Sequence, residues 1–365
     1  MPLSSAAEEA RRVMTFCNAC RYCEGFCAVF PAMERRRTFG ESDLHYLANL
    51  CHNCRDCYYA CQYAPPHEFA LNIPKTMAGL RLETYRDYCW PGVFRGFFKR
   101  NGLFLILTTI LCLGVILGGV RWLQPAEVVF SRHTGSGAFY RVIPYSILVA
   151  VPAIMTIYML VALAKTFWTA WRKSGGRSAD LMNPRAHAVA VYDVLRLKYL
   201  DGGGGGCNYP GEQFSMARRW LHHLVFYGFG ACFAATTFAA FYEHFLHITA
   251  PFAIFSLPVI LGTVGGIAIV IGTSGLLYLK TRLDKAPTAD GFTSMDVGFL
   301  LLLLMTSLSG LALLVFRETA AMGMLLAIHL AFVAAFFLTA PYGKFVHAIL
   351  RYAALVKNAA EEMDS

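Results

Sequence analysis

Two short stretches decide the fold of this chain: CNACRYCEGFC at residues 17–27 and CHNCRDCYYAC at residues 51–61. Each has the spacing C-x2-C-x2-C-x3-C, which gives eight motif cysteines: Cys17, Cys20, Cys23, Cys27, Cys51, Cys54, Cys57 and Cys61. Three cysteines at intervals of three wrap a tight loop around one face of a cubane iron–sulfur cluster and leave one iron for a ligand from elsewhere. The doubled motif therefore predicts two 4Fe-4S clusters.

The ferredoxin pattern also predicts which cysteines hold which cluster, because the fourth cysteine of each motif ligates the other cluster in two-cluster ferredoxins. Cluster one would be held by Cys17, Cys20, Cys23 and Cys61, and cluster two by Cys51, Cys54, Cys57 and Cys27. The alternative is a pair of structural zinc sites, which also use C-x2-C pairs but leave the third interval unexplained. The proline that directly follows the fourth cysteine in small bacterial ferredoxins is absent, and Pro31 and Pro65 come four residues after it.

The segment between the two motifs is expected to be helical. Ser42 can cap a helix, and Leu44, Leu47 and Leu50 follow it at helical spacing. A helical linker is typical of the helical ferredoxin type, which occurs in the iron–sulfur subunits of succinate dehydrogenase and related quinone-linked enzymes. We therefore expect residues 1–101 to form a helical ferredoxin-type domain with two clusters.

The rest of the chain has the composition of a membrane protein. The 365 residues are 56% hydrophobic and only 15% charged, with a mean hydropathy of +0.47. Apolar runs of the length that a bilayer demands begin only after residue 100, at 102–120, 143–167, 221–245, 252–279, 297–316 and 321–340. We predict an all-α protein in which a six-helix transmembrane bundle, 102–350, follows the cysteine domain and precedes a cytoplasmic tail, 351–365.

The distribution of charge predicts the orientation in the membrane. Residues 1–16 hold four charged side chains and no apolar segment of a signal peptide, so we expect the amino terminus to stay in the cytoplasm. Most basic residues then lie in the inside segments, as the positive-inside rule requires, and the net charge of +9 reflects topology rather than nucleic-acid binding. Cysteines in a reducing compartment are expected to bind metal rather than to form disulfides.

Histidines of the membrane domain are the second set of candidate metal ligands. His222 and His244 lie near the two ends of the third span, and His329 and His347 share one helix face about 27 Å apart unless Pro341 kinks that helix. Each of the two helices would thus carry one imidazole near each membrane surface. Two imidazoles that face each other at the same depth are what a bis-histidine haem b site needs.

We predict that His222 pairs with His347 near the cytoplasmic face and that His244 pairs with His329 near the outer face. The inner pair is the first candidate for haem b, and the outer pair would hold a second haem. His223 is the alternative to His222, and interfacial histidines that bind nothing are the alternative to a haem at either pair.

A glycine run, Gly202 to Gly206, lies in the predicted cytoplasmic loop 168–220 and is followed by Cys207. It has too much backbone freedom for a helix or a strand. It could be a flexible linker, or a loop that lies against a partner or cofactor where missing side chains permit close backbone approach. Sequence alone leaves both readings open.

The chain resembles two known families, one over a short stretch and the other over nearly its whole length. PYGKFVH at 341–347, with a histidine eighteen residues before its end, resembles the last helix of the cytochrome b (gamma) subunit of respiratory nitrate reductase. The doubled cysteine motif, GGGGGCNYP at 202–210 and RRWLHHLVFYGF at 218–229 together resemble the tricarballylate utilisation protein B family, also called citrate utilisation protein B.

This second resemblance implies a function. Its members are described as iron–sulfur and haem proteins of the bacterial inner membrane that reoxidise the FAD of a flavoprotein, tricarballylate dehydrogenase, and pass electrons to the quinone pool. The expected partners are thus a flavoprotein, a quinone and the lipid bilayer. No nucleotide motif or nucleophile suggests that the chain dehydrogenates an organic acid by itself.

Two other functions stay open at this point. One is a self-contained reductase similar to heterodisulfide reductases, in which Cys207 or a cluster edge acts directly on substrate. The other is a transporter with a regulatory metal domain, which would show no haem spectrum.

Overall fold

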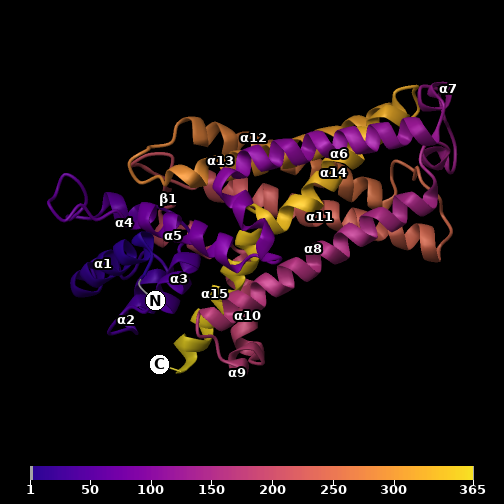
Figure 1. The fold of residues 1–365 in the computed structure, drawn as a ribbon. Coiled ribbons are helices and arrows are strands. Elements are labelled where there is room, and N and C mark those ends of the chain that lie inside the picture. The colour runs from indigo at the N-terminus through magenta and orange to yellow at the C-terminus, as the bar shows by residue number, and fades with distance from the viewer. Residues whose placement is uncertain (1–2, 365) are drawn as a thin grey trace.

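The computed structural model describes residues 3–364, and these residues are almost entirely helical, which confirms the predicted all-α class. The one sheet within them is an antiparallel pairing of β1 (Cys207–Asn208) with β2 (Phe214–Ser215). Figure 1 shows a head that contains the first and the last labelled helices and a long bundle of helices that extends from the head as far as α7 (Ala126–Val129).

The head combines the first five helices with three that come much later in the chain. They are α1 (Ser5–Cys20), α2 (Val29–Glu34), α3 (Glu41–Leu50), α4 (Asp56–Tyr59), α5 (Ile73–Tyr88), α9 (Ser178–Leu181), α10 (Pro184–Leu195) and α15 (Val346–Asp364). Met14 and Leu47 of the cysteine domain belong to the same apolar core as Ala190 of α10 and Val356 of α15. The soluble part of the protein is therefore built from both ends and the middle of the chain.

Each cysteine motif begins where a helix ends. Ser4 caps α1 by accepting a hydrogen bond from the backbone N–H of Ala7, and the helix runs to Cys20, so that Cys17 and Cys20 lie one turn apart. Arg21 then adopts a left-handed conformation with φ of 55°, which ends the helix. In the second motif, Cys51 comes directly after α3. The motif loops therefore start from fixed helix ends.

The predicted helix between the motifs is confirmed as α3, but Ser42 is not its cap. The helix begins at Glu41, and Gly40 occupies the cap position. The Asp43 carboxylate accepts a hydrogen bond from the Gly40 N–H at 3.1 Å, so the acidic side chain of the first turn does the capping that we expected of Ser42.

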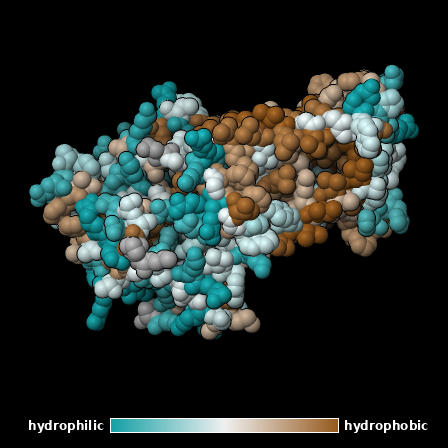
Figure 2. Space-filling view, in the orientation of Figure 1, coloured by the Kyte–Doolittle hydropathy of each residue, from teal (hydrophilic) through white to brown (hydrophobic). Residues whose placement is uncertain are grey.

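Within residues 3–364, six helices are long and apolar enough to cross a membrane, and they match the six predicted spans. They are α6 (Asn101–Leu123), α8 (Tyr145–Lys173), α11 (Ala217–Phe245), α12 (Leu257–Thr281), α13 (Asp290–Phe316) and α14 (Met322–Thr339). Short 3-10 turns connect or extend the elements: η1 (Gly92–Arg100), η2 (Ala138–Arg141), η3 (Lys198–Leu200), η4 (Gly202–Gly204) and η5 (Ala340–Tyr342). A hydrophobic surface covers the bundle between the hydrophilic head and the hydrophilic far end, as a multi-pass membrane protein requires (Figure 2).

Helices α11 and α12 pack closely because glycines let their backbones approach. A Cβ atom added at Gly265 would lie 2.7 Å from the Gly228 carbonyl oxygen, and one added at Gly228 would lie 2.8 Å from the Gly265 carbonyl oxygen. Small residues at the contact are typical of helix pairs in membranes, where close packing replaces the hydrophobic effect as the driving force. This close packing against α12 holds α11 in place, and α11 carries His222 and His244.

Replacing Gly265 with alanine is expected to destabilise the protein, because the methyl group would overlap the Gly228 carbonyl oxygen and the Cys232 sulfur. Overpacking of this kind costs about 1–3 kcal/mol, so the thermal unfolding midpoint in detergent should fall. The matched control is Gly118→Ala in α6, where an added Cβ meets nothing within 4 Å. Equal effects of the two substitutions would contradict the close approach of α11 and α12.

The last predicted span does not continue as one helix through His347. Pro341 lies in η5, and α15 starts only at Val346, after Gly343 in an extended conformation. Proline lacks the N–H that a helix interior needs, and its ring clashes with the preceding turn. His329 in α14 and His347 in α15 therefore lie on separate helices, and the expectation that they share one helix face is wrong.

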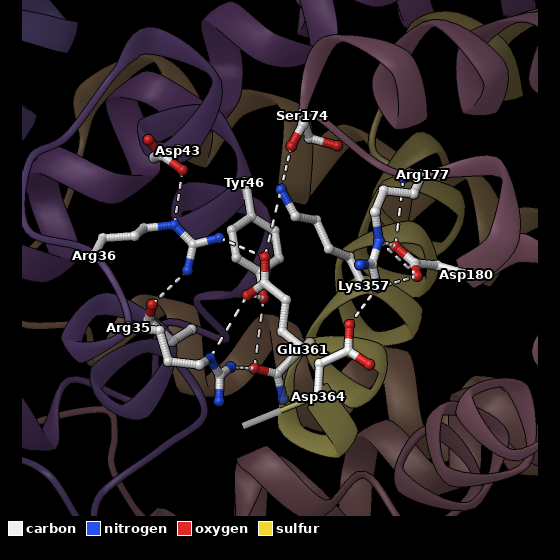
Figure 3. Close-up of polar contacts among 12 residues, drawn as sticks. Arg35, Arg36, Asp43, Tyr46, Ser174, Arg177, Asp180, Lys357, Glu361 and Asp364 are labelled. Carbon is white, nitrogen blue, oxygen red and sulfur yellow. Dashed lines mark hydrogen bonds and ion pairs between the residues drawn. The ribbon is translucent and has the colours of Figure 1, made fainter.

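Residues 351–364, predicted as a tail, are part of helix α15 and belong to the head. Figure 3 shows its last turns held by charged groups: Glu361 accepts from Arg36 at 2.6 Å, and Arg36 also donates to Asp43 at 2.7 Å. On the other side, the Lys357 ammonium donates to the Ser174 carbonyl oxygen at the end of α8. Helix α15 thus ties the cysteine domain to the membrane domain.

Candidate redox centres

The four cysteines predicted for cluster one line a single cavity. Cys17, Cys20 and Cys23 come from the end of α1 and the following turn, and Cys61 comes from just after α4. Cys20 is exposed, and Tyr22, which also lines the cavity, is 69% exposed. This cavity therefore lies at the surface of the head.

The four cysteines predicted for cluster two line a second cavity. Cys27 comes from the first motif and joins the three buried cysteines of the second motif: Cys51, Cys54 and Cys57. Phe30 and Ile73 line both cavities, so the two sites are neighbours separated by apolar side chains. The structure thus brings the motif cysteines together in the two sets that the spacing predicts.

The donor set of each cavity fits a 4Fe-4S cluster, since four cysteine thiolates are the usual ligands of this group. No group of three or more His, Cys, Asp or Glu side chains in residues 3–364 is arranged to hold a single metal ion. Burial, aided by the neighbouring thiols, raises the pKa of Cys17 and of Cys23 to about 12. The bare thiols therefore keep their protons, and iron would have to displace those protons on binding.

The glycine run lies against the second cysteine motif. The backbone N–H of Asn208 donates to the Asp56 carboxylate at 2.9 Å, and a Cβ added at Gly202 would lie 2.5 Å from the other oxygen of that carboxylate. Gly202 also has a φ of +52°, which few other residues adopt. The glycine run therefore lies close to another segment of the same chain, and its contact with a partner or cofactor stays a prediction.

Cys207 does not face solvent. Its side chain is fully buried, and its thiol donates to the Leu200 carbonyl oxygen at 3.4 Å. It packs in a small apolar cluster with Cys54 and Tyr209. Its surroundings are those of a structural thiol rather than of a nucleophile, which needs access to substrate.

Among the histidines, the structure brings His222 and His347 together, with ring centroids 6.4 Å apart and ring planes at 78°. Bonds from metals to imidazole are about 2 Å long, so this separation leaves room for one metal atom between the rings. Nδ1 of His347 donates to the Lys344 carbonyl oxygen at 2.6 Å, which leaves Nε2 unprotonated. Burial lowers the pKa of His347 well below its usual value, so the ring stays neutral.

The surroundings of this pair also fit a haem. Nδ1 of His222 is buried and has no hydrogen-bond partner within the described part of the chain. Two turns along α11, the ring of Phe229 packs against Phe336 and Phe345, which provides the apolar contacts that a porphyrin needs. His223 instead packs its ring against Trp220 and Tyr227, so the geometry favours His222.

The two outer histidines are placed against other partners. His244 is exposed, and its Nδ1 lies 2.8 Å from the Tyr145 hydroxyl. His329 lies 3.1 Å from the Ser309 hydroxyl, and its ring covers Gly310 of α13. A haem between His244 and His329 stays a prediction, and the contacts of the two imidazoles described above are with other side chains.

Sequence reasoning missed two residues at the inner site, Arg218 and Arg351. Both donate hydrogen bonds to backbone carbonyl oxygens of the second cysteine motif. A signal was present in the sequence, because each arginine stands four residues from a predicted haem ligand. Spacing could place the arginines beside the histidines but could not reveal their contact with a motif far away in the chain.

Six apolar helices joined to a head with two four-cysteine cavities define a multi-pass membrane protein with a ferredoxin-like domain. The family profile described as "Citrate utilization protein B" matches residues 98–365, and that of its "Fer4-like domain" matches residues 10–87. "Citrate utilization protein B" of Escherichia coli is 46% identical over 364 residues, which cover 99% of this chain and 94% of that protein. The chain belongs to the citrate utilization protein B family. No solved structure gives a match.

Proposed function

We propose that this protein reoxidises the FAD of a partner dehydrogenase, one similar to tricarballylate dehydrogenase, and passes the electrons to the membrane quinone pool. The Fer4-like domain and the membrane-spanning helices support an electron-transfer role. The observation that carries the proposal is the sequence of three candidate centres. One cavity lies at the head surface, a second lies behind it, and the pair His222 and His347 lies where the head meets the bundle.

Shared lining residues and hydrogen bonds connect the three candidate centres. Phe30 separates the two cavities and lines both. On the far side of the second cavity, the carbonyl oxygens of His52 and Asn53 accept hydrogen bonds from Arg218, which lies one turn before His222 on α11. Each centre is thus separated from the next by a few side chains.

Bound clusters and haem would supply one-electron carriers between two partners that exchange electrons in pairs. Reduced FAD gives up two electrons and two protons, and quinone takes up two of each to become quinol. The net reaction is therefore FADH2 plus quinone to FAD plus quinol. The protein's own contribution is to hold the carriers in order, to keep them apart from water and to dock the flavoprotein.

The flavoprotein is proposed to dock where the cavity predicted for cluster one reaches the surface of the head. Cys20 is exposed there, and Tyr22 offers an exposed aromatic side chain of the kind that is enriched at protein interfaces. The cavity predicted for cluster two is farther from solvent, because three of its four cysteines are buried. Electrons would therefore arrive at cluster one and leave the head from cluster two.

The experiment that tests this function uses the full-length protein in vesicles of bacterial inner membrane. The partner flavoprotein and its polycarboxylate substrate should produce the reduced haem spectrum, and added quinone should restore the oxidised one. The transporter reading predicts no Soret band at all. A haem spectrum that substrate and flavoprotein leave unchanged would contradict the proposed role.

Cys207→Ser is expected to leave electron flow from flavoprotein to quinone within about twofold of the wild-type rate, because serine can keep the hydrogen bond to Leu200 and the site is closed to substrate. The self-contained reductase reading predicts loss of activity instead. The measurement is the rate of quinone reduction in vesicles that contain equal amounts of each protein. A large loss with intact haem and iron content would favour the reductase.

We also propose the cytoplasmic side of the bacterial inner membrane as the location of the head. The positive charges near the inner ends of the spans support this orientation, and the Escherichia coli relative supports a bacterial host. Protease treatment of inverted membrane vesicles should cleave the head, whereas intact spheroplasts should protect it. Cleavage in spheroplasts would reverse the assignment.

A further inference from the structure

Three successive carbonyl oxygens of the second cysteine motif accept hydrogen bonds from guanidinium groups. The Cys51 carbonyl accepts from Arg351 at 2.9 Å and from Arg81 at 2.7 Å. Arg218 donates to the His52 carbonyl at 3.1 Å and to the Asn53 carbonyl at 2.6 Å. These residues line the cavity predicted for cluster two, so the cavity wall is held by side chains that carry fixed positive charge.

Arg81 belongs to the head, but the other two arginines belong to the helices of the inner histidine pair. Arg218 lies four residues before His222 in α11, and Arg351 lies four residues after His347 in α15. Residues four apart in a helix lie on the same face, about one turn from each other. Each helix therefore presents a histidine to the other helix and an arginine to the cysteine motif.

We propose that Arg218 and Arg351 are positioning residues that fix cluster two against the inner haem and direct electron flow from cluster one to cluster two. This inference rests on the proposed function, because it concerns the residues that join the cysteine domain to the helices of the inner histidine pair. Because each arginine shares a rigid helix turn with a haem ligand, any shift of the motif loop relative to the histidines would break hydrogen bonds at both helices. The distance between the two centres is thus set by two short, charge-assisted contacts.

The same arginines also create an electrostatic difference between the two clusters. Reduction adds an electron to a cluster, and nearby positive charge with hydrogen bonding raises its reduction potential. Both arginines are half-buried, so their charge is less screened by solvent than that of Arg21, which is exposed at the first cavity. Cluster two should therefore have the higher potential, which draws an electron from cluster one toward the membrane.

The test replaces each arginine with glutamine in the full-length protein and follows the two clusters separately by electron paramagnetic resonance during a redox titration. In Arg218→Gln and Arg351→Gln, the potential of cluster two should fall while that of cluster one, the internal reference, stays constant. Haem reduction after rapid chemical reduction of the clusters should nevertheless slow about ten- to hundredfold, the usual cost of losing an outer-shell contact, because the motif loop is no longer held against the histidine helices. The matched control is Arg282→Gln, an exposed arginine after α12 that lies near the same membrane face.

If the glutamine variants fail to assemble, the same measurements are made on Arg218→Lys and Arg351→Lys. Lysine retains the charge but not the forked donor, so cluster two should keep much of its potential while haem reduction is still slowed. Unchanged potential and rate in all four variants, with normal iron and haem content, would overturn the inference and leave the proposed function intact. Wild-type protein that lacks haem or clusters would instead refute the proposed function.

Discussion

Replacing His347 with alanine is expected to remove most of the Soret absorbance of the purified protein. His347 is one of the two imidazoles whose rings face each other at 6.4 Å, and its hydrogen bond to Lys344 presents Nε2 as the ligand atom. Without it, only His222 would remain to hold the haem, which would be lost or bound more weakly. His222→Ala should give the same result, since the site needs both rings.

The matched control is His223→Ala, which removes the neighbouring imidazole that packs on Trp220 and Tyr227. Its spectrum should equal that of the wild type. Pyridine haemochrome analysis of the same samples counts the haems: one per chain supports the inner pair alone. A second haem that survives in His347→Ala and disappears in His329→Ala would establish the outer site. An unchanged spectrum in His347→Ala would remove this residue as a ligand.

Cys27→Ser should abolish cluster two, although Cys27 belongs to the first motif in sequence. The reason is the exchange of fourth cysteines, which places Cys27 beside Cys51 and Cys57 in the second cavity. The reciprocal variant, Cys61→Ser, should abolish cluster one. Each variant is expected to fall from about eight irons per chain to about four, and the remaining resonance should be that of the other cluster.

Cys112→Ser is the control for this pair, because Cys112 lies in α6, far from both motifs in the chain. It should retain full iron content and both resonances. If Cys27→Ser instead lost the cluster of its own motif, the clusters would each be held within one motif. Zinc in place of iron in the wild-type protein would refute both assignments.

The spacing of residues in the sequence was enough to predict the features that depend on local physics. Cysteines at intervals of three form a loop around one face of a cubane cluster, so both motifs could be predicted. An apolar run of about 20 residues is long enough to cross a membrane, so all six membrane helices could be predicted. The exchange of Cys27 and Cys61 was predictable for the same reason, since the ferredoxin pattern contains it. His222 and His347 were found because an imidazole in an apolar helix is costly and needs a partner.

Features that depend on contacts between distant segments could not be predicted in this way. Nothing near Gly202 indicates that it would lie against Asp56, and nothing in 351–364 indicates that this amphipathic stretch would complete the core of the head. The break at Pro341 was foreseen as a kink, but its consequence, a separate helix that carries His347 into the head, depends on packing against α10 and α3. Arg218 and Arg351 were overlooked because their acceptors are backbone atoms, which a sequence does not display.

The contribution of α15 to the head also constrains how the protein is made. Val13 and Met14 near the start of the chain share their core with Val356 and Ala359 near its other end. A ribosome that has released the first hundred residues has therefore released only part of the cysteine domain, and the missing helix follows after all six spans have been inserted. Delivery of iron and sulfide to a stable site is thus expected to be a late event, after the membrane helices and α15 have been made.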